Sequence, residues 1–274
     1  MGINSLISAG IDRFYSGAAE DKRLTFGLGP LEFERNKELI GRYLPAGSSV
    51  IIDVGGGPGV YAAWLADMGH YVHLVDPVNK HILQAQKRAS KLKKPFKAAV
   101  GEARKLAFPD GCADVVILHG PLYHLQLRGD RLKALQEAYR VLKPNGILLG
   151  FAINHTVSTL TGLLNGMIHD QQFYAMCMSE LGIGLHNPPA NWPGILPEAF
   201  FHKPDELLTE VQETGFADLK LFAVEGITWL DSKYFESRSD PKKKEAMMEL
   251  LKLTEENKEL LSLSPHLMVC GRKR

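Results

Sequence analysis

The chain contains three groups of residues whose types and spacing suit chemistry on a bound ligand. They are a run of glycines, two acids, and a short stretch that contains His and Tyr. The glycines lie in the run Asp53-Val54-Gly55-Gly56-Gly57-Pro58-Gly59, the second acid is Asp76, and the third group spans residues 119–124. A glycine turn lets a ligand approach bare backbone, and an acid about twenty residues on suits the two hydroxyls of a ribose. Histidines can move protons near neutral pH. The sequence therefore predicts an adenosine-containing cofactor with reaction chemistry beside it.

The neighbouring elements must bring these groups together. The β-branched run 50–54 predicts a buried strand, which ends in the glycine turn and leads into a helix over 61–68. The start of that helix offers unpaired N–H groups. A second strand over 72–76 ends in Asp76. Parallel strands present their carboxyl ends at one crevice, so we expect the glycine turn and Asp76 to lie side by side.

Strands and helices alternate along most of the chain. Further strands are predicted over 96–100, 113–118, 147–153, 216–224 and 267–270. Further helices are predicted over 31–43, 79–92, 131–142, 204–214 and 241–261. Such alternation indicates parallel crossovers. The expected fold is α/β: a Rossmann-like, doubly wound, mostly parallel seven-stranded sheet with helices on both faces.

The alternation stops at residues 154–203. Two helices are expected there, near 156–165 and 170–181, followed by a proline-rich loop. An insertion at the carboxyl edge of a sheet is well placed to act as a helical lid. The predicted organisation is an N-terminal cover segment and helix (1–47), a cofactor-binding core (48–153), the lid (154–203) and a C-terminal part of the core (204–274).

Composition narrows the function classes. The chain has 274 residues, a formal net charge of +1, 45% apolar and 23% charged residues. This length suits one large α/β domain with an insertion, and the charge gives no overall field for nucleic acid or acidic membranes. Three separated cysteines form no CxxC pair, and no apolar run approaches the roughly 20 residues of a membrane span. We expect a cytoplasmic protein that acts on neither nucleic acid nor membrane.

The spacing of the glycines separates two kinds of cofactor. The dinucleotide fingerprint continues from Gly55 and Gly57 to a third glycine, but Val60 stands in that place. A nicotinamide cofactor also leaves Asp53 and Gly59 unexplained. The glycine turn alone is therefore a weak indication of NAD(P).

The run from Asp53 to Gly59 resembles motif I of the class I S-adenosylmethionine-dependent methyltransferases. The resemblance continues, in the family's order, through Asp76, Gly101-Glu102-Ala103, and the stretches 107–116 and 135–146. It covers about residues 48–153 and is nearest to the small-molecule enzymes of the type 11 group. It implies the fold stated above and S-adenosyl-L-methionine as cofactor.

The resemblance also implies roles for individual residues. Gly55 and Gly57 would let backbone approach the methionine part of the cofactor, whose ammonium group Asp53 would help to hold. Gly56 and Gly59 belong to the same loop, although they can equally serve only the turn and the packing of the helix.

The remaining implied contacts lie further along the chain. Asp76, followed by Pro77, would take the ribose hydroxyls, and Glu102 would accept from the adenine amine, with the Ala103 N–H near the ring. An aspartate is more usual at position 102. Leu118 and His119 would lie beside the sulfonium.

Methyl transfer from a sulfonium is an in-line displacement in which the enzyme chiefly aligns the reactants and excludes water. A base is needed only where the acceptor must lose a proton. His119 or His124 can serve as that base and Tyr123 can orient the acceptor; alternatively, Tyr123 and His124 only pack at the start of a helix. No third ligand stands near the two histidines, so no metal site is predicted.

The loop after the fourth strand also bears on the acceptor. His119-Gly120-Pro121-Leu122 lacks the Asn/Asp-Pro-Pro-aromatic pattern of enzymes that methylate amide or adenine nitrogens, and no Pro-Cys nucleophile is present. We expect a small-molecule acceptor, contacted by Tyr15, Tyr123 and His124. The Met and aromatic side chains of the insertion either pack the lid or line the acceptor pocket.

The sequence thus predicts a methyltransferase that moves a methyl group from S-adenosylmethionine to a small organic molecule. Two alternatives stay open: a non-catalytic S-adenosylmethionine-binding protein, and an NAD(P)-dependent oxidoreductase. Neither the acceptor atom nor the oligomeric state follows from the sequence.

Overall fold

The structure is a computed structural model that describes residues 9–17, 20–189, 192 and 195–274. The first eight residues of the predicted N-terminal cover, and Ala190 in the loop of the insertion, lie outside the described residues.

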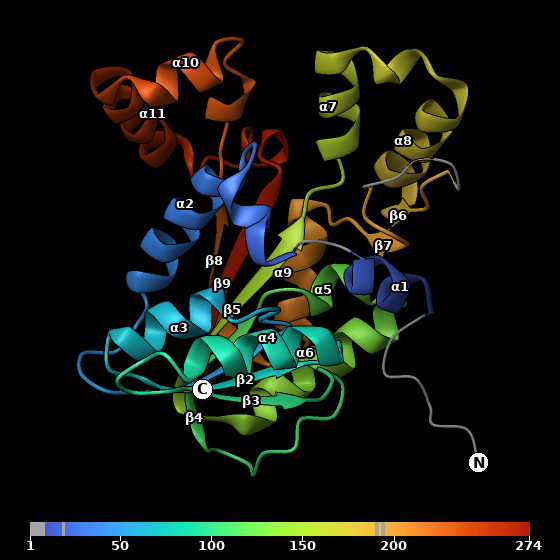
Figure 1. Cartoon of the computed structure of the whole chain (residues 1–274). Helices are drawn as coiled ribbons and strands as arrows, with labels where there is room; N and C mark the ends of the chain where they lie inside the picture. The colour runs from blue at the N-terminus through green and yellow to red at the C-terminus, as the bar shows by residue number, and fades with distance from the viewer. Residues whose placement is uncertain (1–8, 18–19, 190–191, 193–194) are drawn as a thin grey trace.

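A seven-stranded sheet forms the centre of the molecule (Figure 1). Its strands are β1 Val50–Val54, β2 Tyr71–Asp76, β3 Lys97–Val100, β4 Ala113–Leu118, β5 Leu142–Ile153, β8 Phe216–Ala223 and β9 His266–Lys273. The order is β3-β2-β1-β4-β5-β9-β8. The first five strands run parallel, and β9 pairs antiparallel with both β5 and β8. The predicted sheet is confirmed, and its order reverses between β1 and β4, where α/β proteins bind ligands.

Helices pack on both faces of the sheet. Those of one face are α2 Gly29–Gly41, α3 Val60–Asp67 and α4 Asn79–Ala89; those of the other are α6 Arg128–Val141 and α9 Pro204–Glu213. Successive strand residues alternate between the faces: Ile51 packs with the first group and Ile52 with the second. The near-continuous apolar strands thus bury both faces, as parallel sheets require.

Two helical parts project from the carboxyl edge of the sheet (Figure 1). The insertion contains α7 Val157–Asn165, the 3-10 turn η2 Met167–His169 and α8 Gln171–Ile183, then the short pair β6 Leu185–His186 and β7 Ala199–Phe200. The second projection contains α10 Tyr234–Ser239 and α11 Pro241–Thr254. Smaller elements complete the described fold: α1 Ala9–Gly17, η1 Glu20–Thr25, α5 Pro121–His124, η3 Thr228–Leu230 and η4 Leu261–Leu263.

Several predicted boundaries were wrong. Helix α11 ends at Thr254 instead of continuing to 261. The chain turns there because Glu255 forms ion pairs with Arg35 and Arg42, and its carbonyl accepts from the Ala223 N–H beside β8. Strand β5 starts at Leu142, directly after α6, rather than at 147.

No element was predicted before residue 31, yet the structure has α1 and η1 there and starts α2 at Gly29. Helix α10 was missed as well, since six residues give little periodicity to read. Among the described residues, no helix is both long and apolar enough to cross a membrane.

Candidate active site

A cavity of about 340 Å³ lies at the carboxyl ends of β1, β2, β4 and β5. The strand ends and the loops after them provide one wall, which includes Gly55–Gly57, Asp76, Glu102 and His119. The other wall comes from the N-terminal segment and α2. Its lining residues are Ile11, Phe14, Tyr15, Glu20, Arg23, Leu24, Glu32 and Asn36. Most of the sequence-predicted cofactor residues thus share one cavity with residues of the N-terminal segment and α2, 19 to 108 positions upstream of them.

The glycine loop is shaped by tight packing. A Cβ on Gly55, where φ is +75°, would lie 2.9 Å from Pro121, and one on Gly56 would lie 2.4 Å from Asp53 Oδ2. Gly57 is open by contrast: its nearest neighbour would be His81, 4.0 Å away. Gly55 and Gly56 therefore serve the packing of the loop, whereas Gly57 leaves space for a ligand at the cavity wall.

Asp76 is held at the end of β2 by three donors. Its carboxylate accepts from the main-chain N–H groups of Gly57 and Val78, each at 2.9 Å, and contacts Nδ1 of His81 at 3.1 Å. These bonds fix the glycine loop to the second strand. His81, which also lines the cavity, was not identified from the sequence, because nothing distinguishes it from other helix residues there.

The other predicted cofactor residues divide into two groups. Pro77, Glu102 and Ala103 line the cavity, and Glu102 forms an ion pair with Arg104 at 2.8 Å. Three residues do not line it. They are Asp53 beneath the glycine loop, Leu118 in the core, and Gly59, where a Cβ would lie 2.8 Å from the Phe96 ring.

His119 is held between two aromatic rings. It stacks on Tyr61 and Phe151, with ring centroids 4.5 and 4.8 Å away and planes inclined by 16°. Its Nδ1 lies 2.8 Å from Asp53 Oδ1, so the carboxylate favours the tautomer with the proton on Nδ1. Nε2 is buried and has no hydrogen-bond partner among the described residues. Asp53 therefore reaches the cavity only through His119.

His124 pairs with Tyr15, as its Nε2 lies 2.8 Å from the Tyr15 hydroxyl. Burial lowers the pKa of His124 to about 4, so this imidazole is neutral at pH 7. Burial raises the pKa of both Tyr15 and Tyr123 above the usual range, so both phenols keep their protons. The structure thus brings together the three residues predicted to contact the acceptor.

The insertion contributes little to this cavity. Of its described residues only Leu196 lines it, and the Leu196 carbonyl lies 2.9 Å from His186 Nε2. Several of its large side chains pack with one another instead. This separate cluster contains Phe173, Met176 and Cys177, with Met167, Ile168 and Trp192 against it. Of the Met and aromatic side chains for which packing and an acceptor pocket were both considered, Met167, Phe173, Met176 and Trp192 satisfy the packing alternative.

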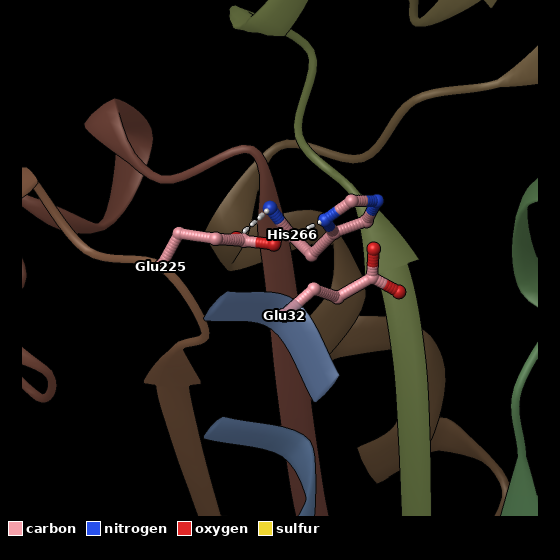
Figure 2. A group of neighbouring side chains, drawn as sticks. All are labelled: Glu32, Glu225 and His266. Atoms are coloured by element: carbon pink, nitrogen blue, oxygen red, sulfur yellow. Dashed lines mark hydrogen bonds and ion pairs between the residues drawn. The ribbon is translucent and has the colours of Figure 1, made fainter. Parts of the chain in front are cut away.

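One end of the cavity carries a charged cluster (Figure 2). Glu32 binds Arg23 through both carboxylate oxygens, at 2.6 and 2.8 Å. His266, at the start of β9, places Nδ1 2.7 Å from Glu225, in the turn after β8. The ligand atoms of Glu32, Glu225 and His266 lie within 4.8 Å of one another. Sequence reasoning missed this cluster, whose members span more than 240 positions.

Residues 52–150 match the model of a methyltransferase domain family. The match runs from β1 into β5 and includes the glycine loop, Asp76, Glu102 and the loop from His119 to His124. With this fold and cavity, it identifies a domain of the class I S-adenosylmethionine-dependent methyltransferases. Residues 52–150 thus form a domain of that family, as the resemblance implied, and the match favours S-adenosylmethionine over a nicotinamide cofactor.

Two curated relatives are similar to parts of the chain. The ubiquinone/menaquinone biosynthesis C-methyltransferase UbiE of Rickettsia bellii is 35% identical over 113 residues, 38% of this chain and 44% of that protein. An uncharacterized methyltransferase of Mycobacterium bovis is 28% identical over 158 residues, 57% of this chain and 75% of that protein. The chain thus spans less than half the length of the first relative.

Solved structures agree on the fold. An S-adenosylmethionine-dependent methyltransferase from Methanosarcina mazei aligns with a TM-score of 0.59 at 16% identity, covering 86% of this chain and 96% of that one. This likeness confirms the Rossmann-like architecture of the chain beyond the segment that the family model matches.

Proposed function

We propose that the protein transfers a methyl group from S-adenosylmethionine to a small organic acceptor by in-line displacement. The observation that carries this proposal is the single cavity that joins the glycine loop and Asp76 to the His119–His124 loop. The N-terminal segment lies across it, with Tyr15 bonded to His124, so the reactants would be shielded from water. A cavity covered by this segment favours a small molecule over a nucleic acid.

The residues that line the cavity indicate where each part of the cofactor would lie. Adenosine would lie toward Asp76, Pro77, Glu102 and Ala103, and the methionine part over Gly57 toward His119. Asp76 would accept from the ribose hydroxyls in addition to the donors it already holds. This pose keeps the sulfonium at the switch point between β1 and β4.

His119 is the better candidate for a general base. Its Nε2 lone pair is free of protein donors, and Asp53 behind the ring would stabilise the imidazolium formed when the acceptor loses a proton. The pKa of about 4 makes His124 a weak base, which suits a role in holding Tyr15 over the cavity.

Two measurements test the proposal. Isothermal titration should show binding of S-adenosylhomocysteine and none of NADH. Labelled methyl from S-adenosylmethionine should then enter a component of a metabolite extract. Cofactor binding without any labelled product would favour a non-catalytic binding protein, and NADH binding alone would contradict the proposal outright. The cytoplasmic location and the covering role of the insertion stay predictions from the sequence.

A further inference from the structure

The charged end of the cavity lies far from the predicted adenosine site. His266 starts β9, and Asp76 ends β2, four strands away in the sheet. At about 4.8 Å per strand this separates them by roughly 19 Å. Glu32 and Asn36, one turn apart on α2, line the same end as His266. These residues are therefore placed to contact the acceptor rather than the adenosine of the cofactor.

Two polar atoms at this end have no protein partner among the described residues. Asn36 is buried and donates Nδ2–H to the Tyr61 hydroxyl at 2.9 Å, but its Oδ1 has no donor. His266 uses Nδ1 for Glu225, and its side chain is 28% exposed. Figure 2 shows the other ring nitrogen turned away from Glu225, on the side of Glu32. Asn36 and His266, each with an unpartnered polar atom, thus line one end of the cavity.

Burial would lower the pKa of His266, but the carboxylates of Glu225 and Glu32 outweigh it and raise the pKa to about 9, against a smaller opposing effect of Arg23. The ring is then an imidazolium at neutral pH, and Nε2–H is a donor. The two unpartnered groups are complementary, because Nε2–H of His266 donates and Oδ1 of Asn36 accepts.

The charges within the cluster cancel except for one. Three carboxylates (Glu20, Glu32 and Glu225) face two cations (Arg23 and His266), which leaves a surplus of one negative charge. This surplus disfavours an anionic group on the acceptor. The imidazolium N–H in turn repels an ammonium group. A neutral group that both donates and accepts fits best.

A metal ion fits less well, although Glu32, Glu225 and His266 could surround one. Arg23 occupies both oxygens of Glu32, and the oxygens of Glu225 hold Nδ1 and the main-chain N–H of His266. A metal ion would have to displace these donors.

We propose that this end of the cavity is a hydroxyl-binding subsite for the acceptor, in which His266 Nε2–H donates to the hydroxyl oxygen and Asn36 Oδ1 accepts a hydrogen bond from the hydroxyl O–H. This inference rests on the proposed function. The aromatic neighbours Tyr61 and Phe151 favour a hydroxyl carried on a ring. The hydroxyl is a binding group and need not be the atom that takes the methyl.

The test uses ring compounds that differ only in one substituent: phenol, toluene, benzoate and benzylamine. Their dissociation constants are measured by NMR titration of the whole chain, with and without S-adenosylhomocysteine. Phenol should bind at least roughly fivefold more tightly than each of the others, as one additional hydrogen bond predicts. Equal affinities, no binding of phenol, or tighter binding of benzoate or benzylamine would overturn the subsite.

Substitutions test which residues cause the preference for phenol. His266→Leu and Asn36→Leu should each remove the preference of phenol over toluene, whereas the exposed control His169→Ala should keep it. If either leucine variant fails to fold, Glu225→Gln replaces it. That variant keeps the ring but lowers the pKa of His266, so the phenol preference should fade at a lower pH than in the parent protein. A preference that is unchanged in all of these variants contradicts the proposal.

Two controls separate the possible failures. Titration with MgCl₂ or ZnCl₂ should show no site that Glu225→Gln removes; such a site would reassign the cluster to a metal. Cofactor binding and methyl transfer are measured on the same preparations. Normal cofactor binding without a phenol preference overturns the subsite alone, whereas loss of cofactor binding overturns the proposed function and leaves the fragment result to stand by itself.

Discussion

At the scale of single residues, Asp76 has two tasks. It holds the glycine loop through the N–H groups of Gly57 and Val78, and it faces the cavity where the ribose would lie. A carboxylate can take several donors at once, so the existing bonds leave lone pairs for a ligand.

Asp76→Ala should therefore weaken binding of S-adenosylhomocysteine by about 1–3 kcal/mol, the loss expected for a hydrogen bond to a charged group. Isothermal titration measures this change. The exposed Asp67→Ala on α3 removes an acid without touching the cavity and should leave affinity unchanged. A folded Asp76→Ala variant with normal affinity would remove the ribose assignment.

The pair of Asp53 and His119 supports a second prediction at this scale. If His119 takes a proton from the acceptor, His119→Ala should lower the transfer rate by about 10²–10⁴-fold with little change in cofactor affinity. Asp53→Asn should act in the same direction, because the amide no longer stabilises the imidazolium. His169→Ala is the exposed control. A loss confined to cofactor affinity would instead assign His119 to the cofactor's ammonium group.

At the scale of elements, the segment predicted as an N-terminal cover lines the cavity much more extensively than the insertion does. Helix α1 and turn η1 lie over the cavity, tied by Tyr15 to His124 and by Arg23 to Glu32. The insertion has its own small core and reaches the cavity only at Leu196 among its described residues. The covering element is therefore short and held by a few polar contacts.

Tyr15→Phe removes one of these contacts and keeps the ring. We expect the free energy needed to open the segment to fall by about 0.5–1.5 kcal/mol, the net contribution of one hydrogen bond. The segment should therefore open more often. Tryptic cleavage after Lys22 and Arg23 should then be faster than in the parent protein, and S-adenosylhomocysteine should slow it in both. The exposed Tyr174→Phe serves as control. Equal cleavage rates in Tyr15→Phe and the parent would show that the hydroxyl does not hold the segment.

At the scale of the whole molecule, the sequence predicted the sheet and the glycine loop well, because both depend on local patterns. Short β-branched runs such as 50–54 and the turn after them can be read within one window. The charged end of the cavity could not be read in this way. His266 and Glu225 meet Glu32 only because β9 runs antiparallel between β5 and β8, and no local signal encodes that contact.

Long-range contacts of this kind also explain the misplaced helix end and the position of the N-terminal segment against the cavity. Glu255 turns the chain toward α2 because two arginines there bind it, so the helical pattern over 241–261 was interrupted by tertiary structure. The pairing of Tyr15 with His124 spans 109 positions. Sequence periodicity carries no information on such pairs.

The free energy of unfolding of the whole protein should depend on pH through the pKa of His266. In the unfolded chain this histidine titrates near 6.5, and in the folded protein near 9. The resulting stabilisation, on the order of 3 kcal/mol, is fully present below pH 6.5 and is lost as the pH rises through 9. Urea titrations should therefore show the parent losing its advantage over Glu225→Gln across that window. A difference that does not change between pH 6 and 10 would contradict the raised pKa.

The segment that lies over the cavity also limits how reactants enter and leave. Because Tyr15 and Arg23 hold the segment over the cavity through His124 and Glu32, we expect the cofactor and its demethylated product to pass when these contacts are broken. We therefore expect a compulsory binding order, cofactor first, with product departure setting the turnover number. Turnover would then fall in viscous solvent, and burst kinetics would appear in the first catalytic cycle.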